Sequence, residues 1–201
     1  GPSRNIGQDF FVTLTVTNTG GATASSLNTK GFLIAGPGNA TFTDGPEPPM
    51  TSFDLVGGQG RVFTWTYTGS VAGLVRFSTT VTALDANSGA ALSLVATSNT
   101  LMIQAGALLD GMVTLSAATL CTGQNLQVRL TVTNGGQASA TLLIAAAWEP
   151  TGGGLASLVA GPSSATPYVL AGGATRTVTW TFTGSVAGPL TFSTTVTSAP
   201  T

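Results

Sequence analysis

Few side chains in this sequence have the chemistry that catalysis or metal binding requires. Among 201 residues there are no histidines, one cysteine (Cys121) and seven acidic residues. Covalent catalysis needs a nucleophile beside a base, and general acid–base catalysis needs titratable groups placed against the substrate. No spacing in the sequence supplies such a set. We therefore expect no catalytic residues, no cofactor-binding residues and no enzyme activity.

Two groups of oxygen-bearing residues are candidates for a calcium ion, which prefers oxygen ligands. Asp44, Glu47 and Asp54 lie in and near a proline-rich segment. These three residues have no counterparts in the second half of the sequence, so they are better interpreted as charged residues that keep a loop soluble than as calcium ligands. Asp85, Asn87 and Gly89 resemble the start of a calcium loop, but the downstream glutamate is absent. An Asx-type hairpin turn accounts for that group better. We expect no metal site.

Cys121 is the single thiol, so no disulfide can form within the chain. It could cross-link two chains, but the prediction is a small buried thiol that behaves as an apolar residue.

The composition is unusual in its low content of charged residues. Asp, Glu, Lys and Arg make up 6% of the residues, against roughly 25% in average proteins, although the hydrophobic share of 42% is ordinary. Hydroxyls, amides and small side chains must therefore cover the surface, and such a surface repels its own copies weakly. The net charge of −1 leaves no basic face for nucleic acid or an anionic membrane. No apolar run is long enough for membrane insertion.

The sequence repeats itself once. GQDFFVTLTVTN at Gly7–Asn18 recurs as GQNLQVRLTVTN at Gly123–Asn134. FTWTYTGSVAG at Phe63–Gly73 recurs as VTWTFTGSVAG at Val178–Gly188, and FSTTVT follows each of these later blocks. The nearly constant offset of the matched blocks predicts two copies of one domain, because chance does not repeat spacing as well as sequence. Divergent segments between the blocks are typical of loops.

The matched blocks alternate apolar and polar residues, which is typical of half-buried strands. Val12, Leu14 and Val16 fall on one face, and threonines alternate with them on the other. Many short strands with one apolar face each predict an all-β chain of two tandem immunoglobulin-like antiparallel β-sandwiches. Further strands are expected at Gly31–Ala35, Ser52–Val56, Ala90–Gln104, Met112–Leu120, Thr141–Ala147 and Leu155–Ala160. The expected core residues are Trp65, Phe77 and Leu14 in the first copy, and Trp180, Phe192 and Leu130 in the second.

LTVTNTGGATAS at Leu14–Ser25 and TWTYTGSVAG at Thr64–Gly73 resemble the CARDB-type (cell-adhesion-related) immunoglobulin-like surface repeats of bacteria. The second copy departs at the turn, where Gly135-Gly136-Gln137-Ala138 replaces Thr19-Gly20-Gly21-Ala22 but keeps the glycines. The resemblance implies an extracellular module on the cell surface, used as a spacer, a stalk or part of an adhesin. It implies no catalytic residues.

The domains are expected at residues 1–106 and 107–201, and the two copies begin and end at different phases. The second has Met112–Leu120 ahead of its Gly-Gln, where the first has only Gly1–Ile6, so an opening strand looks missing from copy one. The first copy continues past Val81 into Gly89–Gln104. Copy two has no counterpart of this segment, so the closing strand of copy two looks missing. Either the sequence is a piece of a longer array, or a neighbouring copy or chain donates the strand and builds a filament.

The expected function is structural: a repeat in a bacterial stalk, fibre or adhesin, forming a two-domain rod. Its partners would be neighbouring immunoglobulin-like repeats of the same or another chain. The alternative is a binding module that recognises a glycan or a surface protein through the variable loops Ala35–Met50 and Trp148–Tyr168. Trp148 is the candidate binding-loop residue: exposure of its indole would favour binding, and burial would favour a spacer. A flat binding array of hydroxyls is disfavoured, because sandwich sheets twist.

Overall fold

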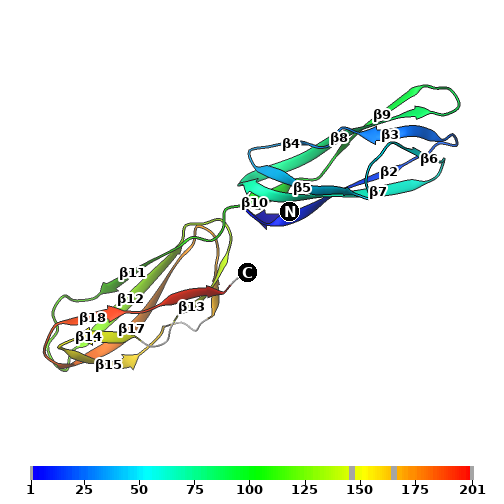
Figure 1. Cartoon of the computed structure of the whole chain (residues 1–201). Helices are drawn as coiled ribbons and strands as arrows, with labels where there is room; N and C mark the ends of the chain where they lie inside the picture. Colours follow the sequence, from blue (N-terminus) through cyan, green and yellow to red (C-terminus); the bar gives the residue numbers. More distant parts are fainter. Residues whose placement is uncertain (1, 145–147, 164–166, 200–201) are drawn as a thin grey trace. The chain divides into compact units, whose positions relative to one another are not determined.

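The computed structural model describes residues 2–144, 148–163 and 167–199. The chain divides into two compact units, Gly1–Ala105 (unit 1) and Gly106–Thr201 (unit 2). Every regular element in the described residues is a β-strand, so the prediction of an all-β chain is confirmed (Figure 1). Within these residues no helix has the length and apolar character needed to cross a membrane.

Unit 1 is built from two sheets. One has the strand order β2-β7-β5, and the other has the order β1-β10-β8-β3-β6, with β4 and β9 also paired to β8. The strands of unit 1 are β1 (Ser3–Asn5), β2 (Asp9–Thr17), β3 (Ala24–Thr29), β4 (Leu33–Ala35), β5 (Asn39–Glu47), β6 (Phe53–Leu55), β7 (Gly60–Val71), β8 (Gly73–Asp85), β9 (Ala91–Thr97) and β10 (Leu101–Gln104).

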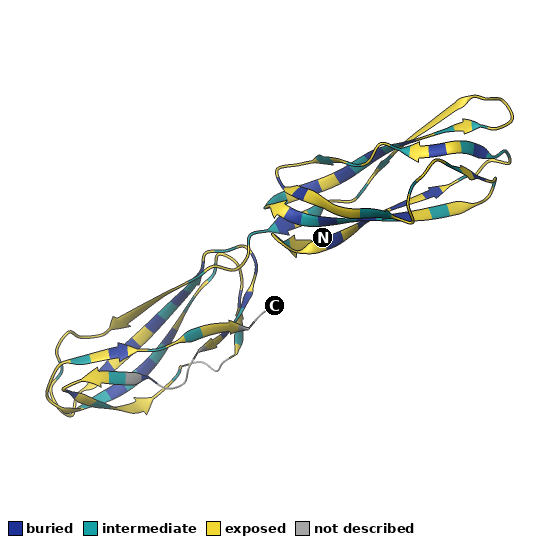
Figure 2. Cartoon of the chain, viewed as in Figure 1, coloured by how far each residue is buried: buried dark blue, intermediate teal, exposed yellow. Residues whose placement is uncertain are grey.

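Alternating side chains along these strands build the core of unit 1. Every second residue of β2 is buried, and the same alternation runs along β7 and the first half of β8 (Figure 2). The two sheets meet across this core, where Trp65 from β7 is 4% exposed and Phe77 from β8 is 2% exposed. Leu14 is buried beside them. Thr79 is a buried polar residue of β8, and its hydroxyl is hydrogen-bonded to that of Thr29.

Unit 2 repeats much of this plan. Its strands form a sheet of order β11-β12-β17-β15, a sheet of order β16-β13-β19 and the pair β14-β18. They are β11 (Leu109–Leu115), β12 (Asn125–Asn134), β13 (Ala140–Ile144), β14 (Glu149–Gly152), β15 (Leu155–Ala160), β16 (Tyr168–Leu170), β17 (Thr175–Val186), β18 (Leu190–Ser193) and β19 (Val196–Ala199). Trp180 is fully buried at the centre, with Leu130 and Phe192 in the same core cluster.

The two units share one register in their central pair of antiparallel strands. In unit 1, β2 pairs antiparallel with β7 and sets Val12 opposite Trp65. In unit 2, β12 pairs antiparallel with β17 and sets Val128 opposite Trp180. A slip of one residue would turn every apolar side chain of a strand to the wrong face. The repeated blocks of sequence therefore encode a repeated register as well as repeated strands.

Several expectations about strands were wrong. The segment Ala35–Met50 was expected to be a loop, but most of it is β5, which pairs with β7 through three register shifts. These irregularities break the alternation of burial, so the sequence pattern does not show a strand. β1, β3, β14 and β16 were likewise missed, although β1 lies in Gly1–Ile6, where an opening strand was expected to be missing. The strand predicted at Met112–Leu120 lies instead at Leu109–Leu115. The end of the strand predicted at Thr141–Ala147 lies outside the described residues.

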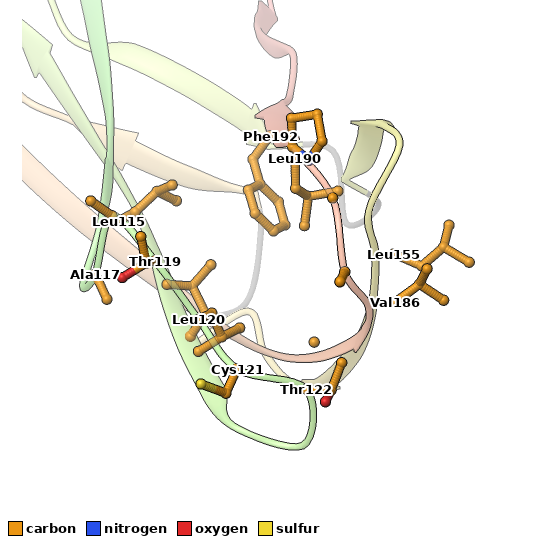
Figure 3. A pocket seen from close by; sticks show the side chains of 16 residues that line it. Leu115, Ala117, Thr119, Leu120, Cys121, Thr122, Leu155, Val186, Leu190 and Phe192 are labelled. Atoms are coloured by element: carbon orange, nitrogen blue, oxygen red, sulfur yellow. The ribbon is translucent and has the colours of Figure 1, made fainter.

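Cys121 was expected to be buried, and this was wrong: the free thiol is exposed. The residue lies in the turn that leads into β12, where its backbone carbonyl accepts a hydrogen bond from Gln124 N at 3.1 Å. Cys121 N also donates to Gln124 Oε1 at 3.1 Å, so this turn (Figure 3) is held by backbone and side-chain bonds that leave the thiol in solvent.

Leu130→Ala should lower the free energy of unfolding of unit 2 by about 2–5 kcal/mol, because it leaves a cavity in the core. Thr131→Ala, the next residue on the opposite face of the same strand, should change it by less than about 1 kcal/mol. Urea denaturation followed by tryptophan fluorescence measures both. Equal losses for the two variants would contradict the assignment of faces.

Candidate functional site

The acidic residues proposed as calcium ligands do not gather into a site. In the described residues no three side chains among Asp, Glu, Cys and His come together as a metal would require. Asp54 accepts a hydrogen bond from the backbone N–H of Ser26 at 2.9 Å, and Ser26 has a positive φ of 54°. Asp44 accepts one from Gly45 N at 2.8 Å. Glu47 lies at the end of β5, opposite Thr64. Asp44 thus bonds the next backbone amide in its own strand, and Asp54 of β6 holds the backbone of the neighbouring strand β3.

Asp85 closes the hairpin between β8 and β9, and the expected Asx-type turn is confirmed. Its Oδ1 accepts hydrogen bonds from Asn87 N at 2.9 Å, Ser88 N at 2.8 Å and Ser88 Oγ at 3.0 Å. The bonds from Ser88, followed by that from Asn87, lower the pKa of the Asp85 carboxyl, since all of them favour the charged form. This carboxylate oxygen is therefore already occupied by the turn.

Trp148, the candidate binding-loop residue, is buried; of the two outcomes left open above, burial is the one that favours a spacer. It is 7% exposed, and its ring meets Trp180 edge-on with the centroids 5.1 Å apart. It also lies edge-on to Phe192 at 6.2 Å. Burial against two other aromatic rings of the core accounts for its position. Its indole is not available to a ligand.

One polar residue shared by both repeats has a structural role that the sequence reasoning missed. Asn134 is fully buried, and its Nδ2 donates to Ala138 O at 2.8 Å and to Leu170 O at 3.1 Å. Its Oδ1 accepts from Leu108 N at 3.1 Å and Gly136 N at 3.0 Å. The side chain thus ties the end of β12 to the following turn and to β16. The sequence did offer a signal for this role, because Asn134 is the final residue of the repeated LTVTN block.

Asn18 makes the equivalent contacts in unit 1. Its Nδ2 donates to Ala22 O and to Leu55 O, both at 2.8 Å, and its Oδ1 accepts from Gly20 N at 3.0 Å. Asn18 is half-buried, whereas Asn134 is fully enclosed. The final Asn of the LTVTN motif therefore holds the same corner of each unit, where the strand ends and the next turn begins.

The outward threonines form cross-strand pairs. Thr131 and Thr177 hydroxyls lie 3.1 Å apart between β12 and β17, and those of Thr133 and Thr175 lie 3.0 Å apart. Such pairs stabilise a sheet without charge. They account for the threonine rows as part of the strand surface.

Sheet edges are the features that remain as candidate functional surfaces. β2 pairs with β7 along one side, and no other described strand pairs with it. In unit 2, β18 pairs with β14 and β19 pairs with β13, and the described residues cover no second side of either strand. An open edge presents backbone donors and acceptors to a further strand. These open edges are therefore the candidate interaction surfaces of the described residues.

Comparison with known proteins identifies no family for the chain. No family model matches it, and no curated protein matches it. Among solved structures, a similar one is the secreted serine protease VesC from Vibrio cholerae, with 11% identity and a TM-score of 0.29. The match covers 98% of this chain and 49% of the protease chain, so the chain spans about half of that protein's length. Function must therefore be inferred from the geometry of the chain itself.

The Asp85 turn should be sensitive to acid. A carboxyl with a lowered folded pKa stabilises the fold above its unfolded pKa, and this stabilisation is lost as the pH falls through the folded value. The amide protons of Asn87 and Ser88 should therefore shift with a midpoint below the usual aspartate pKa of about 3.9. NMR titration measures it, and the shift should vanish in Asp85→Asn. A midpoint at or above 3.9 would show that the turn does not favour the carboxylate.

Asn134→Ala should destabilise unit 2 by roughly 3 kcal/mol or more, because it leaves several buried backbone groups without partners at about 1–3 kcal/mol each. Asn18→Ala is the matched variant in unit 1. It should cost less, since water can reach the half-buried groups that it frees. Denaturation of both variants measures the difference, and an unaffected unit 2 would show that Asn134 does not hold the corner.

Proposed function

We propose that this chain is a structural repeat of a bacterial extracellular stalk, fibre or adhesin, and that it has no catalytic activity. Each unit would be an immunoglobulin-like antiparallel β-sandwich of the type that the CARDB-like sequence suggests. Its partners would be neighbouring repeats of the same or another chain at the cell surface. The observation that carries the proposal is the ladder between the first and the last strand of unit 1.

That ladder is parallel. β1 pairs with β10, with Ser3 opposite Met102 and Asn5 opposite Gln104. Flanking backbone bonds extend it at both ends: Met102 N donates to Pro2 O at 3.2 Å, and Ile6 N donates to Gln104 O at 2.9 Å. The chain enters unit 1 at the start of one strand and leaves at the end of its parallel neighbour. Tension on the two ends therefore shears all these bonds at once, instead of opening them one after another.

A shear ladder suits a protein that transmits tension. Hydrogen bonds that are loaded together share the force, whereas bonds that open one after another from one end each carry the whole force in turn. A second support is the repetition of the β2–β7 register in β12–β17, since a stalk is built from units that repeat. The surface is also consistent with this role, because threonine pairs replace charges on it.

The alternative, a module that binds a glycan or a protein through its variable loops, has less support. Its best anchor was Trp148, whose ring packs against Trp180 and Phe192. The segment Ala35–Met50 is largely β5, and Trp148–Tyr168 contains β14 and β15. Much of the two proposed loops therefore consists of paired strands.

Single-molecule pulling from the two ends of the chain tests the proposal. We expect two unfolding events, each with a contour-length gain of roughly 300–350 Å, from about 3.3–3.6 Å per extended residue. Unit 1 should unfold at the higher force. In the described residues of unit 2, the first strand, β11, pairs antiparallel with β12, and the last, β19, pairs with β13, so no parallel terminal ladder exists there.

Arg4→Pro removes a backbone N–H from the middle of the ladder and should lower the unfolding force of unit 1 toward that of unit 2. Ser3→Pro is the matched control. The alternation set by the bonds of Pro2 O and Ile6 N turns the Ser3 N–H away from β10, so this variant should keep most of the force. Equal forces for unit 1 with and without Arg4→Pro would contradict a mechanical role for the ladder.

A further inference from the structure

Unit 2 contains a chemically labile pair of residues at the end of β12. Asn134 is followed by Gly135, and this is the one Asn-Gly pair in the sequence. In an unstructured chain, the backbone nitrogen of the residue after an asparagine can attack the side-chain Cγ. A glycine hinders this attack least, because it has no side chain and its backbone is the most flexible. Asn-Gly is therefore the pair at which asparagine loses its amide most readily.

Unit 1 has threonine in place of this glycine. Asn18 corresponds to Asn134 by the offset of the repeat, so Thr19 corresponds to Gly135. Threonine is β-branched, and its side chain crowds the backbone nitrogen beside it. The same corner of the fold thus carries a fast pair in unit 2 and a slow pair in unit 1.

The fold does not require a glycine at position 135. A Cβ built on Gly135 would meet Leu108 O at 3.8 Å, which is an ordinary van der Waals distance. Gly135 is also not among the glycines with a positive φ. The next glycine is different, since a Cβ on Gly136 would lie 2.0 Å from Gly106 O. Backbone geometry therefore accounts for Gly136 and leaves Gly135 open to substitution.

In the folded chain, the corner keeps both reacting groups from this chemistry. The Asn134 side chain is fully buried, and four hydrogen bonds fix its amide. The attacking nitrogen is occupied as well, because Gly135 N donates to Leu108 O at 2.7 Å. Attack requires this nitrogen to lose its proton and approach Cγ, and the hydrolysis that follows requires water. Folding therefore opposes both steps.

We propose that Asn134-Gly135 is a latent deamidation site, which the fold of unit 2 protects and unfolding exposes. In the exposed chain, Gly135 N loses its proton and forms a bond to Asn134 Cγ. The bond from Cγ to Nδ2 breaks, and Nδ2 leaves with that proton as ammonia. Water then opens the resulting succinimide ring at one of its two carbonyl groups, which leaves aspartate or isoaspartate at position 134.

Either product breaks the corner that the asparagine holds. Asn134 Nδ2 donates to Ala138 O at 2.8 Å and to Leu170 O at 3.1 Å. An aspartate would place a carboxylate oxygen against these two carbonyl oxygens, and a buried charge without a partner destabilises a fold strongly. Isoaspartate instead adds a methylene to the backbone between β12 and the following turn. Unit 2 should therefore fail to refold once Asn134 has reacted.

This inference goes beyond the proposed function, and it gives the unfolding of unit 2 a lasting consequence. Unit 2 is the unit expected to open at the lower force, and the sequence of unit 1 has no Asn-Gly pair to expose. A short opening is reversible, because the chain refolds before the amide reacts. A long opening converts Asn134 and makes the loss of unit 2 permanent.

Mass spectrometry of the whole chain tests the site. The chain is kept for equal times in buffer and in urea, both at mildly alkaline pH, and is then digested. In urea, Asn134 should deamidate at least about tenfold faster than Asn18, because threonine shields the nitrogen after Asn18. In buffer, Asn134 should react at least about tenfold more slowly than in urea, since it reacts only when the fold opens.

Gly135→Ala separates the chemistry from the packing. This variant should fold like the parent, because the added methyl group has room beside Leu108 O. Its Asn134 should react much more slowly in urea. Gly111→Ala is the matched control, since a Cβ there meets no neighbour and lies away from the pair, so the rate should not change. If Gly135→Ala fails to fold, the comparison of Asn134 with Asn18 in the unfolded parent still decides.

Refolding measures the consequence. After increasing times in urea, the chain is diluted into buffer, and hydrogen exchange reports the recovery of each unit separately. The fraction of unit 2 that refolds should fall in step with deamidation at Asn134, whereas unit 1 should recover. Unit 2 of the Gly135→Ala chain should keep its ability to refold over the same times.

Three results would overturn the proposal. They are deamidation of Asn134 as fast in buffer as in urea, reaction in urea no faster than that of Asn18, and normal refolding of unit 2 in deamidated chains. None of these measurements applies force, so their failure would leave the structural function standing. A weak ladder in unit 1 would equally leave the deamidation site untouched.

Discussion

The pairing of β2 with β7, repeated as β12 with β17, is the constraint on which the rest of each unit depends. It sets a valine opposite the central tryptophan and turns every second side chain inward. Because the side-chain period of a strand is two, the register decides the whole inner face at once. The facing strands, the aromatic contacts of Trp180 and the corner held by Asn134 are all placed relative to this pair.

The two units differ in how their edges are completed. In unit 1, β10 buries Ile103 and joins the two ends of the unit in one parallel ladder. In unit 2, β11 instead pairs along the outer edge of β12, whereas no described strand pairs with the equivalent edge of β2.

The low charge of the chain agrees with the way its polar side chains are used. Its polar groups are used locally: Asp85 holds a turn, Asn18 and Asn134 hold corners, and threonine hydroxyls pair across strands. Buried polar groups that are fully hydrogen-bonded specify geometry, since leaving any one of them unpaired is costly.

The sequence by itself determined the all-β class, the duplication and the inward faces of the central strands, because alternation and repetition are local properties that the chain carries in its order of residues. It did not reveal β5, whose bulges break the alternation, nor the burial of Trp148 and the exposure of Cys121. Those depend on which distant strands pack against a segment. The hydrogen bonds of Asn134 are likewise decided by tertiary structure, since only the packing of distant segments brings Leu108 N and Leu170 O to its side chain.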